Sequence, residues 1–76
     1  MTQAARSAVA LWREADGRAR EAETSLTVAR QAYADGTGPE PSVELQSEAR
    51  LLRKLADSLL KAAIASLGRA ANSARG

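Results

Sequence analysis

Apolar residues recur at alternating steps of three and four along both halves of the chain, the spacing that places them on one face of an α-helix. The first series is Met1, Ala5, Ala8, Trp12, Ala15, Ala19, Ala22, Leu26, Ala29 and Tyr33. The second series, which contains one small polar residue, is Leu45, Ala49, Leu52, Ala56, Leu59, Ala63, Ser66 and Ala70. The pattern therefore predicts two amphipathic helices with heptad seams.

Glycine and proline separate the two series in the segment Asp-Gly-Thr-Gly-Pro-Glu-Pro at residues 35–41. We expect Gly36 to adopt the left-handed conformation that commonly ends a helix. Pro39 or Pro41 can stand in the first turn of the next helix, where a missing N–H costs nothing. The predicted fold class is all-α, a single domain over residues 1–76. Its expected segments are a helix over about 2–34, a loop over 35–41, a helix over about 42–71 and a frayed tail over 72–76.

Alanine recurs every seventh residue within both series and predicts how the helices pair. The two sets are Ala8, Ala15, Ala22 and Ala29, then Ala49, Ala56, Ala63 and Ala70. Residues that face each other in a hairpin have numbers with a constant sum. The two alanine sets match at a sum of 78, which places the midpoint at residue 39, inside the loop. We therefore predict an antiparallel two-helix hairpin, an alanine-rich coiled coil in which Ala22 faces Ala56 and Tyr33 faces Leu45.

Apolar residues of the second helix extend to both sides of its seam, and this stripe is wider than one partner helix can cover. The residues are Leu51 and Leu55 on one side, and Leu60, Ile64 and Leu67 on the other. We expect them to form an interface with a partner, together with Val9 and Trp12. The partner is either a second copy, which would complete a homodimeric four-helix bundle, or a different protein.

The amino-acid composition argues against several classes of function. The chain has 76 residues and contains neither cysteine nor histidine, so disulfides are excluded and a zinc site is not expected. A chain this short, without a histidine base or cysteine nucleophile, is not expected to be an enzyme, and we expect no cofactor. No apolar run reaches about 18 residues, and the first residues lack the pattern of a secretory signal. The expected location is the cytoplasm.

Eleven basic and nine acidic residues are interleaved, for a net charge of +2. Four oppositely charged pairs are spaced to form ion pairs along a helix: Glu14–Arg18, Asp16–Arg20, Arg53–Asp57 and Asp57–Lys61. This interleaving favours a solvated surface over a nucleic-acid site. A weak basic stripe is formed by Arg50, Arg53, Lys54 and Lys61. A nucleic-acid-binding homodimer that uses this stripe is one alternative function, and a structural coiled-coil subunit is another.

The most specific motif surrounds the loop and reads A-x-G-x-x-P-E-x-x-x-x-L-Q-x-x-A-R-x-L from Ala34 to Leu52. It resembles the small co-chaperones of type III secretion needle subunits, which are helical hairpins of similar size. The resemblance implies a cytoplasmic binding protein that stabilises a larger tetratricopeptide-like chaperone. Together the two would keep a needle subunit soluble before export. A small hairpin with surplus leucines would gain most of its stability on binding such a partner.

Overall fold

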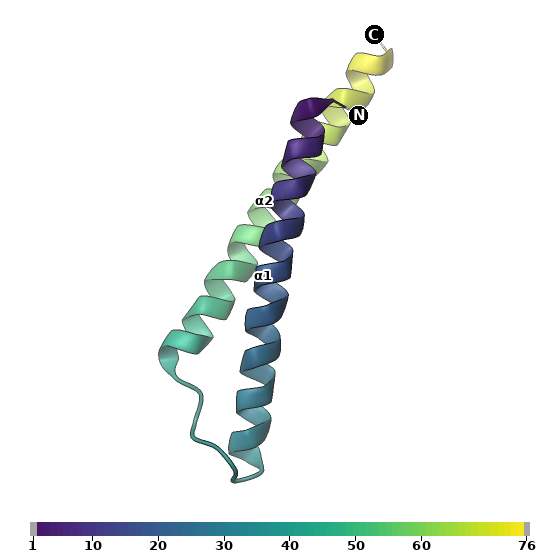
Figure 1. The fold of residues 1–76 in the computed structure, drawn as a ribbon. Coiled ribbons are helices and arrows are strands. Elements are labelled where there is room, and N and C mark those ends of the chain that lie inside the picture. Colours follow the sequence, from purple (N-terminus) through teal and green to yellow (C-terminus); the bar gives the residue numbers. More distant parts are fainter. Residues whose placement is uncertain (1, 76) are drawn as a thin grey trace.

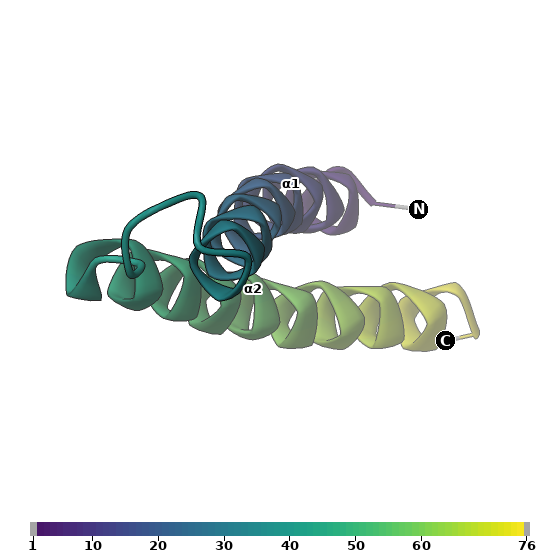
Figure 2. The same cartoon turned by 90° about the horizontal axis from the view of Figure 1, so that it is seen from below.

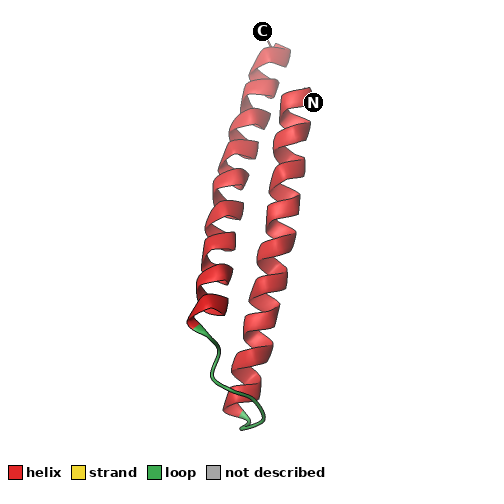
Figure 3. Ribbon diagram, turned by 60° about the vertical axis from the view of Figure 1, so that its left-hand side comes forward, coloured by secondary structure: helices red, strands yellow, loops and turns green. Residues whose placement is uncertain are grey.

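The chain forms two long antiparallel helices that lie side by side and are joined at one end by a loop (Figures 1 and 3). The computed structural model describes the backbone of residues 2–75 and the side chains of residues 2–69 and 71. Helix α1 spans Gln3–Ala34 and helix α2 spans Val43–Arg75, so α2 continues beyond its expected end near residue 71. The molecule measures 61 × 15 × 14 Å. The predicted all-α helical hairpin is confirmed.

Both ends of α1 are capped by local hydrogen bonds. At its start, the hydroxyl of Thr2 accepts a hydrogen bond from the N–H of Ala5 at 3.1 Å. At its end, Gly36 has a φ of 76°, as expected for the left-handed residue that follows a helix. The N–H of Gly36 donates to the carbonyl of Tyr33 at 3.1 Å, and the N–H of Thr37 donates to that of Ala32 at 2.8 Å. These two bonds form a Schellman motif.

Helix α2 begins after both prolines, so the expectation that one of them stands in its first turn is wrong. The hydroxyl of Ser42 accepts a hydrogen bond from the N–H of Leu45 at 3.1 Å and caps the helix. The side-chain amide of Gln46 donates to the carbonyl of Pro41 at 3.1 Å. Because serine supplies a capping oxygen that proline lacks, the helix starts at Val43.

The helices pair with an offset of about one turn from the predicted register. Ala56 packs against Ala15 and Ala19, and not against Ala22 as predicted. The loop is the cause, because its second half runs back beside the end of α1 before α2 begins (Figure 1). The last turn of α1 consequently has no helix opposite it. Tyr33, which was predicted to face Leu45, is 53% exposed.

The buried side chains are small. They are Ala5, Ala15, Ala19, Leu26, Ala49, Ala56 and Ala63. The half-buried members of the two series are Ala8, Trp12, Ala22, Ala29, Leu45, Leu52, Leu59 and Ser66. The side chain of Ala70 lies outside the described residues, as do those of the expected tail over 72–76. The helix axes cross at an angle (Figure 2), and the partly buried Leu52 and Leu59 pack against the central alanine cluster.

We predict that Ala56→Leu destabilises the hairpin by about 1–3 kcal/mol, because a larger side chain at this fully buried position pushes the helices apart. Thermal unfolding followed by circular dichroism measures the effect. Ala65→Leu makes the same change at an exposed position of α2 and serves as the control. An unchanged melting temperature for Ala56→Leu would disprove close packing at this position.

Alanine substitutions of two glycines, one in α1 and one in the loop, provide a second test. Their expected effects on the stability of the hairpin have opposite signs. Gly17 lies inside α1 with open space where a Cβ would be, so Gly17→Ala should stabilise the hairpin by about 0.5–1 kcal/mol. Gly36→Ala places a Cβ on a residue with a φ of +76° and should destabilise it by about 1 kcal/mol. Urea unfolding of the two variants measures both changes. Equal effects would contradict the left-handed cap.

Candidate protein-interaction surfaces

The hairpin has two flanks, one on each side of the helix contact. A groove on one side is lined by Leu11, Leu55 and Leu59, and we call this side the leucine flank. Arg53 lies on the other side. It is two residues from Leu55, and a separation of two residues along an α-helix turns the side chain by roughly 200°. We call this side, which also carries Arg30, Arg50 and Lys54 along a second groove, the basic flank.

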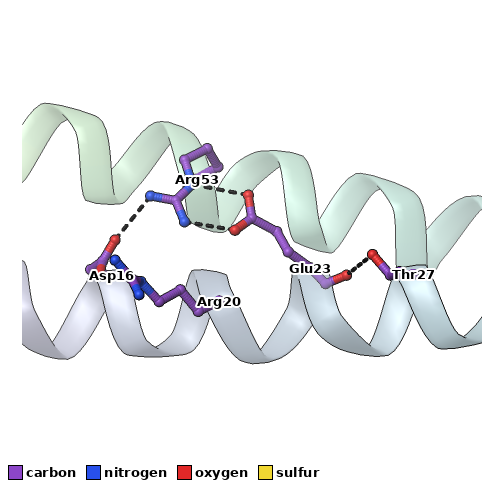
Figure 4. Close-up of polar contacts among 5 residues, drawn as sticks. All are labelled: Asp16, Arg20, Glu23, Thr27 and Arg53. Carbon is purple, nitrogen blue, oxygen red and sulfur yellow. Dashed lines mark hydrogen bonds and ion pairs between the residues drawn. The ribbon is translucent and has the colours of Figure 1, made fainter.

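Arg53 connects the two helices across the basic flank (Figure 4). Its guanidinium binds Glu23 through two hydrogen bonds, from Nε to Oε2 at 3.0 Å and from Nη2 to Oε1 at 2.6 Å. Its Nη1 donates to Oδ1 of Asp16 at 3.0 Å. The other oxygen of Asp16 accepts from Nε of Arg20 at 2.8 Å. The side chain of Asp16 is only 17% exposed, so solvent screens this ion pair less than the exposed pair of Arg18 with Glu14.

These contacts shift the pKa values of the ionisable groups. The hydrogen bond from Arg53 is the largest cause that lowers the pKa of Asp16, and the nearby charge of Arg20 adds to it. The hydrogen bond from Arg53 also lowers the pKa of Glu23. The pKa of Arg53 is raised, first by Glu23 and then by Asp16. All three groups are therefore more firmly ionised than in the unfolded chain.

The network changes the interpretation of two sequence patterns. The predicted pairs Glu14–Arg18 and Asp16–Arg20 are formed, at 2.9 and 2.8 Å. Arg53 binds α1 and not Asp57, so the pairing predicted along α2 is wrong at this residue. Arg53 is thus neutralised within the chain, which removes it from the basic stripe proposed for nucleic acid.

The groove on the basic flank has a volume of about 430 Å³. Its apolar lining includes Leu26 and Ala49, which are buried between the helices. Arg30, Arg50 and Lys54 line it as well, and among the described residues none of these three forms an ion pair. The groove therefore combines an apolar floor with three cations available to a ligand.

The leucine flank is apolar and acidic. Leu11 is 54% exposed and Leu55 is 50% exposed beside a groove of about 170 Å³. Closer to the loop, a groove of about 380 Å³ on the same flank is lined by the half-buried Leu45 and Leu52. Its carboxylates are Glu21 and Glu48. The two flanks thus differ in the sign of their charge.

The residues predicted to bind a partner lie on both flanks. Leu51 shares the side of Leu55, four residues away, and is 65% exposed. Leu60 and Leu67 follow Arg53 at intervals of seven, which places them on the basic flank together with Ile64. Val9 precedes Asp16 and Glu23 at the same interval on α1 and therefore also lies on the basic flank. The exposed members of the predicted set are Leu51, Leu55, Ile64 and Leu67, and the half-buried ones are Val9, Trp12 and Leu60.

Sequence reasoning missed Leu11 and the basic groove. Leu11 directly precedes the seam residue Trp12, and this place beside the seam, like those of Leu51 and Leu55 in the second helix, is the signal that identifies it. Arg30 could not be assigned to a groove from sequence, because its neighbours Arg50 and Lys54 come from the other helix.

Among the described residues, no cluster of three or more carboxylates forms a candidate metal site. Neither described helix has a stretch that is both long and apolar enough to cross a membrane. No family model matches the chain, and neither a curated protein nor a solved structure matches it. The two flanks are therefore the features of the chain that indicate its function.

We predict that the hairpin loses stability as the pH falls below about 4.3, the ordinary pKa of glutamate. Folding lowers the pKa values of Asp16 and Glu23, so their stabilisation is present above the unfolded values and is lost as the pH falls through the folded values. Melting temperatures measured between neutral and acidic pH test this. Arg53→Gln should flatten the dependence, whereas Arg18→Gln, at an exposed pair, should retain it. Equal profiles for the two variants would contradict this role of Arg53.

Proposed function

We propose that this chain is a protein-binding adaptor that completes a larger helical assembly, and that it is not an enzyme. The observation that carries the proposal is the imbalance between its small core and its apolar surface. The largest side chain in the buried set is Leu26, whereas Leu51, Leu55 and Ile64 are each at least half exposed. Burial of each of these three by a partner would contribute about 1.5–3 kcal/mol.

The accessible surface supports the same proposal. It is 5605 Å², whereas a folded monomer of this mass has about 4,450 Å². The excess is comparable to the area of about 800 Å² that one partner buries in a standard interface. An elongated hairpin of this size, without disulfides, gains stability when a partner covers its flanks.

The loop motif supports a more specific form of the proposal, in which the partner is a tetratricopeptide-like chaperone. In this form the pair keeps a type III secretion needle subunit soluble in the cytoplasm before export. Gly36, Leu45, Ala49 and Leu52 of the motif build the turn and the contact between the helices. The motif thus supports the hairpin scaffold, and the exposed apolar residues outside it are the proposed binding surface.

Apolar residues on both flanks suit a hairpin held between helices of its partner, since amphipathic faces commonly dock in apolar grooves. Leu55 would meet the partner on the leucine flank. Ile64 and Leu67 would meet it on the basic flank. A homodimer would bury the same residues against a second copy and is the alternative that the following experiment distinguishes.

We predict that Ile64→Asp and Leu55→Asp each abolish a complex with the co-expressed chaperone while the helical content is retained, because both side chains are exposed in the free hairpin. Val28→Asp is the matched control, since Val28 is similarly exposed but lines neither the groove of Leu55 nor that of Arg53. Size exclusion with light scattering measures the complex, and circular dichroism measures the helix.

A stable homodimer that forms no complex with the chaperone would contradict the co-chaperone proposal. Loss of helix together with loss of binding in Ile64→Asp would make Ile64 a core residue of the hairpin and would contradict its assignment to the interface.

A further inference from the structure

The two flanks carry opposite charge, which distinguishes the ligands that they can accept. The groove of the basic flank is lined by four cations and one carboxylate, Arg30, Arg50, Arg53, Lys54 and Glu23. The two grooves of the leucine flank are lined by three carboxylates and one cation, Glu14, Glu21, Glu48 and Arg18. Asp16 and Glu23 neutralise Arg53, so Arg30, Arg50 and Lys54 give the groove its positive potential, and a partner that lies in the groove meets it.

The basic flank changes in character along its length. Near the chain termini it carries exposed apolar side chains, with Ile64 60% and Leu67 39% exposed, and Arg6 and Arg13 line a groove there beside Val9. Near the loop it carries the groove with Arg30, Arg50 and Lys54. From Arg50 to Leu67 the distance along α2 is about 25 Å, which is the length of a partner helix of about 17 residues. A single helix can therefore contact both parts of this flank.

We infer that the groove of the basic flank is a docking site for an amphipathic helix of the partner protein, with carboxylates beside its apolar face where it passes Arg30, Arg50 and Lys54. The inference rests on the proposed function in that it assumes a protein partner, and it adds the chemistry of that partner. The apolar side chains of the helix would contact Leu26 and Ala49. Its carboxylates would accept hydrogen bonds from the three cations.

A carboxylate bound by a guanidinium already lies at this groove. Glu23 is held by Arg53 through two bonds of 2.6 and 3.0 Å at the edge of the same groove. A nucleic acid is a poorer match, because neither Trp12 nor Tyr33 lines the groove and no aromatic ring is therefore available there for base stacking. A second copy that covered this groove with its own, about a two-fold axis through the groove, would place the cations against each other.

The test uses a synthetic helical peptide of about 17 residues, with leucines at helical spacing and glutamates beside them. A second peptide has glutamine at each glutamate position. The groove variant is Arg30→Gln/Arg50→Gln. Its control is Arg18→Gln/Arg69→Gln, which removes the same charge from residues that line neither this groove nor the groove beside Val9. Fluorescence anisotropy measures binding, and circular dichroism verifies that both variants remain helical.

We expect the glutamate peptide to bind at least about tenfold more tightly than the glutamine peptide, with an affinity that falls as salt is added. The groove variant should lose at least about tenfold in affinity, and the control variant should lose less than about twofold. Equal binding of the two peptides would overturn the inference. So would tighter binding of a single-stranded RNA, or self-association of the chain that disappears in the groove variant.

The result is separable from that for the proposed function. If the chaperone complex forms and survives the groove variant while the glutamate peptide fails to bind, the inference is wrong and the adaptor function stands. If the glutamate peptide binds and depends on the groove but no complex with the chaperone forms, the acidic-helix site stands and the co-chaperone proposal is wrong.

Discussion

The two helices can approach closely because the residues between them are small. Among the residues whose side chains are described, six of the seven buried ones are alanines and the seventh is Leu26. An alanine contact brings two helix backbones together but removes little apolar surface from water. The larger apolar side chains consequently lie on the flanks, where Leu51 and Ile64 remain 65% and 60% exposed. The packing that forms the hairpin thus also leaves the surface for which we propose a partner.

The loop decides how this contact is aligned. Gly36 ends α1 in a left-handed conformation, and the N–H of Gly38 donates to the carbonyl of Ala32 at 3.2 Å, so the chain turns back at once. A Cβ at Gly38 would lie 3.1 Å from that of Ala32, which is tighter than an ordinary contact. The segment up to Ser42 then runs beside α1 before α2 begins (Figure 1). The resulting offset of about one turn determines which side chains meet across the hairpin.

The offset has an electrostatic consequence. In the register predicted from the alanines, Arg53 would lie level with Ser25. In the structure it lies between Asp16 and Glu23 and binds both (Figure 4). Arg53 thus contributes to the pairing of the helices, while Arg30, Arg50 and Lys54 stay available in the groove beside it. The proposed preference for an acidic helix arises from this division between one paired and three unpaired cations.

The sequence by itself determined the two helices, the face that each turns to the other and the glycine that ends α1. These features depend on periodicity and on hydrogen bonds between residues close in the chain. It also identified four exposed apolar residues, Leu51, Leu55, Ile64 and Leu67, because these lie beside the seam of α2. Only the tertiary structure decided the register and the partners of Arg53. Alanine occupies successive seam positions, such as Ala15, Ala19 and Ala22, so a shift of one turn exchanges alanine for alanine and leaves the pattern nearly unchanged. The path of the loop resolves that ambiguity, and no local pattern in the sequence encodes it.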